Sequence, residues 1–178
     1  PHDPCSASGM DWDIVYSTST DGTTWAAQVH VNSRAATDSG GDYNPAIAHG
    51  GGTFVAVWHS GDPFAASGTD QDIVYSTSTD GTTWAAQVHV NSRAATDTGH
   101  DQIPAITHGG GTFVAVWQSN DPFSASGLDW DIVSSTSTDG TTWAAPVHVN
   151  SRAATASRAD YNAGTAPGRA PVLVVAPS

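Results

Sequence analysis

The sequence predicts an all-β fold built from four-stranded antiparallel blades of the β-propeller type. A string of 26 residues, Asp13 to Asp38, returns unchanged at Asp72 to Asp97, and most of it returns again from Asp131. The copies are 59 residues apart, and self-similarity at a fixed period indicates a repeat architecture. The chain also has no Glu and no Lys, on which long helices usually draw, whereas Gly, Ser, Thr and Val are plentiful.

The 178 residues are predicted to form a single array of about three repeats. Repeat 1 covers about 1–59, repeat 2 about 60–118 and repeat 3 about 119–178, with degeneration after 155. A single-chain propeller needs about four to eight blades to close, so this array is expected to be incomplete or closed by another chain. It is then a fragment of a larger propeller, half of a two-chain ring, or a unit that adds head to tail.

The first two strands of a blade are predicted from PAIAHGGGTFVAVWHS at 45–60, where two apolar runs flank three glycines. In the second run Phe54, Ala56 and Trp58 share one face, and Val55 and Val57 share the other. Both faces are apolar, so this strand is expected to be sandwiched between sheets.

The other two strands of the blade follow in DIVYSTS from Asp72 and in AAQVHVN, separated by the turn STDGTTW. In the fourth strand Val88 and Val90 alternate with three polar residues, a half-solvated pattern expected at an outer edge. The chain begins with strands three and four of one blade. It ends with strands one and two of another, the last of them at 172–175.

The turn STDGTTW occurs three times without change, first at Ser19 to Trp25. Asp21 is expected to accept hydrogen bonds from N–H groups of its own turn, and Gly22 to supply a backbone conformation that other residues resist. Trp25 is expected to cover the edge of the blade.

These turns resemble the box of the Asp-box propellers, the bacterial neuraminidase repeats of the sialidase-like superfamily, in their Ser, Asp, Thr and Trp. The resemblance covers nearly the whole chain. It implies that the boxes stabilise the fold and lie on the face away from an active site. The residues concerned are Ser19, Asp21, Gly22, Thr24 and Trp25, then Ser78, Asp80, Gly81, Thr83 and Trp84, then Ser137, Asp139, Gly140, Thr142 and Trp143.

A formal net charge of −12 argues against binding to nucleic acid or to anionic membranes, since both require a basic surface. No apolar run approaches the roughly 18 residues of a membrane span, and the lone Cys5 cannot form an internal disulfide. We expect an extracellular or cell-surface protein.

Two long Asp-rich loops per repeat are expected on one face, opposite the STDGTTW turns. Short carboxylates along glycine-rich loops suit Ca²⁺, which takes six to eight oxygen ligands, although the same residues can simply cap turns. In the third repeat Ala156 replaces the acid found at 38 and 97. The candidate calcium ligands are Asp11, Asp13, Asp38, Asp42, Asp70, Asp72, Asp97, Asp101, Asp129 and Asp131.

Two tryptophans, Trp12 and Trp130, lie beside these acidic loops and are candidates for contact with a carbohydrate or protein ligand. The alternative is that each covers its own loop.

The resemblance implies a set of catalytic groups that can be looked for in this sequence. They are an arginine triad, a tyrosine nucleophile assisted by glutamate, and an aspartate acid/base. The chain has no Glu, and Arg34, Arg93 and Arg152 occupy one repeated position that suits a blade-to-blade contact better than a convergent triad. These observations argue against an enzyme.

The function expected from the sequence is therefore a non-catalytic structural or adhesive propeller. It would assemble through its blade edges into a homo-oligomer or homopolymer, with calcium as an optional stabiliser. The alternatives are a glycan-binding module of a sialidase-like protein and a partial sialidase-type glycosidase.

Overall fold

The computed structural model describes residues 11–65, 67–122, 129–149, 159–166 and 173–175. All regular structure in these ranges is β-strand, in twelve strands, which confirms the all-β prediction. A helix long and apolar enough to cross a membrane is absent from the same residues.

Two four-stranded antiparallel sheets form complete blades, each with its strands in sequence order. The first consists of β3 (Asp42–Gly50), β4 (Thr53–Ser60), β5 (Asp72–Ser78) and β6 (Val88–His89). The second consists of β7 (Asp101–Gly109), β8 (Thr112–Ser119), β9 (Asp131–Ser137) and β10 (Val147–His148).

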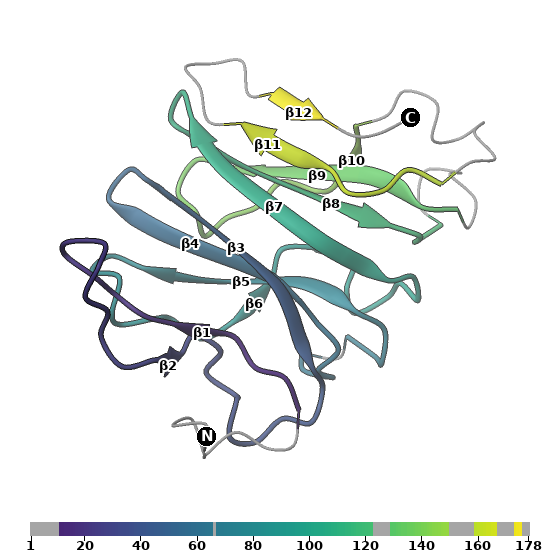
Figure 1. Ribbon diagram of the computed structural model, residues 1–178. Coiled ribbons are helices and arrows are strands. Elements are labelled where there is room, and N and C mark those ends of the chain that lie inside the picture. The colour runs from purple at the N-terminus through teal and green to yellow at the C-terminus, as the bar shows by residue number, and fades with distance from the viewer. Residues whose placement is uncertain (1–10, 66, 123–128, 150–158, 167–172, 176–178) are drawn as a thin grey trace.

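A two-stranded half-blade lies at each end of the chain. The first pairs β1 (Val15–Tyr16) with β2 (Val29–His30), which are strands three and four of a blade. The last pairs β11 (Gly164–Ala166) with β12 (Leu173–Val175), which are strands one and two. Figure 1 shows the two full blades side by side, with β1–β2 flanking one of them and β11–β12 flanking the other.

The core lies between the blades, because β4 and β8 have apolar side chains on both faces. Val55 and Val57 of β4 pack in one cluster with Phe113, Ala115 and Trp117 of β8. On the opposite face of β4, Ala56 and Trp58 pack with Ile14 and Val31 of the first half-blade, in a second cluster. The predicted sandwiching of the second strand is therefore observed.

The burial predicted for the outer strand was wrong around β6, where apolar residues were expected to be buried and polar residues exposed. Val88 is half exposed, whereas the polar Gln87 and Asn91 are buried together with Val90. Burial of Asn91 has a clear reason, because its Nδ2 donates to Asp97 Oδ2 and Asp101 Oδ2 at 2.8 Å each. A buried amide is tolerated when its polar atoms find partners, so here polarity does not mark the solvent face.

Candidate functional site

The start of the first strand of each blade carries a β-bulge. The register of β3 against β4 shifts between Tyr43 and Ala46, and β7 repeats the shift between Gln102 and Ala105. Asn44 has a φ of 53° within this bulge, and Ile103 and Asn162 have nearly the same value. Positive φ is unusual for a β-branched residue such as isoleucine, and bulges of this kind re-aim the neighbouring side chain.

The bulges lie beside the loops that carry the two candidate tryptophans. The Asp42 N–H donates to the carbonyl oxygen of Trp12 at 2.7 Å. The same bond recurs from Asp160 to Trp130, again at 2.7 Å, and from Asp101 to Gln71. The residue just before each positive-φ segment is thereby bonded to a loop residue of the preceding blade. We call the six residues of these three places the bulge face: Trp12 with Tyr43, Gln71 with Gln102, and Trp130 with Tyr161.

The side chains of the bulge face form polar and aromatic contacts. Tyr43 stacks on His59 with ring centroids 5.4 Å apart, and Tyr161 lies 6.2 Å from Trp130. Between them, Gln102 donates through Nε2 to Gln71 Oε1 and accepts from Gln118 Nε2. Trp12 is 72% exposed, and both tyrosines are also exposed. Aromatic rings beside amide groups are the usual composition of a carbohydrate contact surface.

The repeats differ from one another on this face although the first two are identical over 26 consecutive residues. Trp12 corresponds to Gln71 and Trp130, Tyr43 to Gln102 and Tyr161, and His59 to Gln118. His59 and Gln118 nevertheless do the same thing, because each accepts a hydrogen bond from the N–H of the positive-φ residue in the next blade. His59 Nδ1 accepts from Ile103 N–H and Gln118 Oε1 accepts from Asn162 N–H, both at 3.4 Å. The bulge face therefore presents unlike groups on a repeated frame.

Sequence reasoning found the two tryptophans of this face but missed the tyrosines, Gln71 and Gln102. Tyr43 and Tyr161 stand two periods apart at equivalent positions, and no local pattern marks a bulge. The signal that could have found them was the set of positions at which the copies differ.

Beside the bulge face, the acidic loops gather into two groups. Asp11, Asp13 and Asp38 each offer a carboxylate oxygen within 4.8 Å of the others, and Asp70, Asp72 and Asp97 do the same one period later. Among the described residues no such group includes the other predicted ligands, which are Asp42, Asp101, Asp129 and Asp131.

The pKa values of these carboxyls reflect their burial. Burial first, and then the charge of Asp101 before the other nearby acids, raises the pKa of Asp72 to about 9. Burial also raises the pKa of Asp42 and of Asp101 to about 7, and that of Asp38 to about 6.

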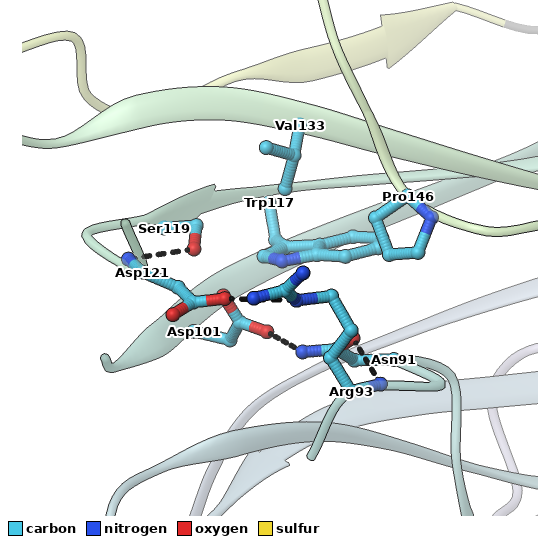
Figure 2. Close-up of a pocket in the computed structure, with 8 residues that line it drawn as sticks. All are labelled: Asn91, Arg93, Asp101, Trp117, Ser119, Asp121, Val133 and Pro146. Carbon is cyan, nitrogen blue, oxygen red and sulfur yellow. Dashed lines mark hydrogen bonds and ion pairs between the residues drawn. The ribbon is translucent and has the colours of Figure 1, made fainter. Parts of the chain in front are cut away.

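Arg34 and Arg93 contact the neighbouring blade, as their repeated position predicted, and Arg152 lies outside the described residues. Arg34 Nε lies 2.8 Å from Asp62 Oδ2, and Arg93 Nε lies 3.4 Å from Asp121 Oδ2. Figure 2 shows Arg93, Asp121 and Trp117 pointing toward one another in a narrow pocket at the second junction. That pocket is lined by Asn91, Arg93, Asp101, Trp117, Ser119, Asp121, Val133 and Pro146.

The STDGTTW turns have the internal bonding that their sequence predicts. In the first copy Asp21 Oδ1 accepts from the N–H groups of Thr23 at 2.8 Å and Thr24 at 2.7 Å, and Ser19 Oγ accepts from Gly22 N–H at 2.8 Å. Gly22 has a φ of 73°, in the left-handed region. The same bonds recur around Asp80 and Asp139.

The tryptophans of the turns do not all cover a blade. Trp84 lies 5.8 Å from Tyr16 of the preceding half-blade, and Trp143 lies 5.8 Å from Tyr75. Trp25 is 61% exposed, which corrects the expectation for this copy. The reason is that the two packed tryptophans contact a preceding blade, whereas the described residues include no blade before the half-blade of Trp25.

Solved structures share this fold. The GH93 α-L-arabinofuranosidase of Fusarium graminearum, in complex with arabinobiose, matches 94% of this chain over 51% of its own length, with a TM-score of 0.61 and 16% identity. The α-L-arabinanase of Penicillium chrysogenum, also complexed with arabinobiose, matches 86% of this chain over 45% of its own, with a TM-score of 0.58 and 17% identity. An N-acetylgalactosamine deacetylase from F. plautii, in complex with blood group B trisaccharide, matches 84% over 42%, with a TM-score of 0.50 and 17% identity.

The chain has a β-propeller fold. It spans about half the length of these solved structures. No protein-family model and no curated protein matches it.

The comparisons correct the expectation of a non-catalytic structural or adhesive protein. Three propellers that share its blade arrangement are enzymes, namely an arabinofuranosidase, an arabinanase and a deacetylase. The absence of Glu was given too much weight, because the two carboxylates of a glycosidase can both be Asp. The repeats also supply unlike groups at equivalent positions, as the bulge face shows. Self-assembly through blade edges receives no support from these findings.

Proposed function

We propose that this chain is a carbohydrate-binding portion of a glycosidase-type β-propeller, and that its bulge face holds sugar rings. The observation that carries the proposal is the row of exposed aromatic side chains, Trp12, Tyr43 and Tyr161, set beside the paired amides of Gln71 and Gln102. Sugar rings stack on aromatic faces through their C–H groups, and their hydroxyls exchange hydrogen bonds with amides.

The shared fold adds support to this proposal. Two of the structures with this arrangement of blades carry arabinobiose and the third carries a trisaccharide. The chain spans about half of their length. We therefore propose sugar binding for this chain and hydrolysis only for a complete propeller that contains it. We also assign the three STDGTTW turns to the Asp-box type on the strength of their bonding, and an extracellular location remains a prediction.

Glycan retention tests the proposal. The chain is applied to a glycan array and to affinity electrophoresis in arabinan, together with Trp12→Ala and Trp130→Ala. The matched control is Trp25→Ala, which removes an equally large exposed ring from a turn outside the bulge face. We expect retention to fall in both bulge-face variants and to stay unchanged in the control.

Three results would count against this function. They are no retention of the unmodified chain on any glycan, equal losses in all three variants, or retention untouched by Trp12→Ala and Trp130→Ala. Release of sugar from arabinan or from fluorogenic arabinofuranosides and sialosides is measured in parallel, and such release would place the catalytic groups within these blades.

A further inference from the structure

Two acidic triads stand at equivalent positions 59 residues apart. The first triad is Asp11, Asp13 and Asp38, and the second triad is Asp70, Asp72 and Asp97. In each, two members lie where the chain enters the third strand of a blade, Asp72 being the first residue of β5, and the other comes from the connection that leaves the fourth strand. Chain segments that are separate in sequence therefore place three carboxylates at one point.

The spacing of the carboxylate oxygens fits a single ion. In both triads the three oxygens lie within 4.8 Å of one another. Calcium binds oxygen at about 2.3–2.6 Å, so two ligands on opposite sides of one ion are about 4.6–5.2 Å apart. Each triad is thus compact enough for all three side chains to share one ion.

Burial without hydrogen-bond partners distinguishes these triads from ordinary acidic loops. Asp72 is 1% exposed, and neither of its carboxylate oxygens has a hydrogen-bond partner among the described residues. In the first triad the Asp13 side chain is 5% exposed and its Oδ2 likewise has none. Leaving a buried carboxylate unpaired is costly, so such groups normally have a partner or a metal ion.

The surrounding charges do not balance the acids of the second triad. Asp101 and Asp121 are also close to Asp72. Arg93 pairs with Asp121 at 3.4 Å and its charge also acts on Asp97, so one arginine faces several acids. His89 Nε2 is 4.0 Å from Asp72 Oδ2, which is beyond hydrogen-bond distance, and neither atom has a hydrogen-bond partner among the described residues.

Neighbouring groups also orient the triad. Asn91 Nδ2 holds Asp97 Oδ2 at 2.8 Å, while Asp97 Oδ1 has no hydrogen-bond partner. In the first triad Asn32 Nδ2 holds Asp13 Oδ1 at 2.6 Å and leaves Oδ2 without one. A ligand carboxylate fixed through its second oxygen is typical of metal sites.

We propose that each triad binds one Ca²⁺ ion, giving two calcium sites per chain. All-oxygen ligand sets select hard cations, and Ca²⁺ suits a site of several flexible carboxylates better than Mg²⁺, which usually keeps most of its waters. A third site at the equivalent place is not expected, because Ala156 stands where the triads have Asp38 and Asp97. The bound ions fasten the connection between successive blades to the strand behind it.

The test uses the 178-residue chain, stripped with chelator and titrated with Ca²⁺ by calorimetry, with the thermal midpoint recorded in calcium and in chelator. We expect two ions per chain and a higher midpoint in calcium. Asp13→Asn and Asp72→Asn should each lose one ion or weaken it by about tenfold or more, and the double variant should lose both. Asp80→Asn is the control, because Asp80 bonds only within its own turn and should leave both ions bound.

Loss of folding is separated from loss of binding by the measurements in chelator. Asparagine has nearly the same size as the buried carboxyl that it replaces and cannot become charged, so Asp72→Asn should be at least as stable as the unmodified chain without calcium, while its rise in midpoint with calcium shrinks. The proposal would be overturned by the absence of binding, by a single site in the unmodified chain, by two sites persisting in the double variant, or by tighter binding of Mg²⁺ than of Ca²⁺.

Discussion

The substitution His59→Gln should remove much of the acid sensitivity of this protein. His59 is 5% exposed, stacks on Tyr43, and accepts a hydrogen bond from Ile103 N–H. Its burial lowers its pKa from 6.5 to about 4. The folded state then binds fewer protons than the unfolded state between these values. The stability contributed by the neutral imidazole is thus complete above pH 6.5 and is lost as the pH falls toward 4.

The magnitude follows from the size of the shift. One pKa unit corresponds to about 1.4 kcal/mol, so a shift of about 2.5 units makes His59 responsible for at most about 3 kcal/mol of lost stability on acidification. Glutamine should fit the site, because Gln118 occupies the equivalent position and accepts a bond of the same 3.4 Å length. The two proteins should therefore be similarly stable at neutral pH.

Urea unfolding between pH 7.5 and 4.5, at constant calcium, measures this difference. Aspartates titrate in both proteins, so the informative quantity is the gap between their free energies of unfolding. The gap should open by about 2 kcal/mol or more in favour of His59→Gln as the pH falls. Parallel curves for the two proteins would refute the reasoning.

Three further predictions concern the blades. Trp117→Ala should lower the free energy of unfolding by about 3–5 kcal/mol because this indole is fully buried, whereas Trp25→Ala should lower it far less. Urea unfolding compares the two variants, and equal losses would contradict the assigned packing. Hydrogen bonds from two backbone N–H groups hold the pKa of Asp80 well below its usual range. The contribution of this carboxylate to stability should therefore be present above pH 3.8 and lost on further acidification. An NMR titration of the carboxyl group measures the pKa, and an ordinary value would contradict the prediction. Gly99→Ala should lower the thermal midpoint, because the added Cβ would collide with the backbone of Asp121. Gly164→Ala should have little effect, because the added Cβ meets nothing within 4 Å. A smaller loss at 99 than at 164 would argue against this contact.

The blades could be predicted from the sequence because their signals are local. The strand from Asp72 was located correctly because an alternating β-branched run ends at a turn with its own bonding pattern. The outer strand was assigned the wrong burial, because Asn91 is drawn inward by Asp97 and Asp101, which follow it in another segment. Polarity alone does not reveal such a partner.

The candidate site was only half predictable for a similar reason. Trp12 and Trp130 are noticeable in any reading, but Tyr43 reaches the same face only because a bulge with positive φ interrupts the register of β3. The composition suggested acidic loops with affinity for cations. Which three carboxylates of each repeat come together depends on the stacking of one blade on the next, which no single period contains.

The two junctions between successive blades contain the same tyrosine hydrogen bond. Tyr16 Oη donates to the carbonyl oxygen of Thr82 at 2.6 Å, and Tyr75 Oη makes the same bond to Thr141, again across 66 residues. The first two periods thus each donate the same bond to the turn of the period that follows, whereas the third has Ser134 at the tyrosine position. A gene that duplicates the second period would lengthen the array while repeating an interface that already exists. Divergence is then left to the bulge positions, where each blade can acquire its own ligand contacts while the frame stays constant.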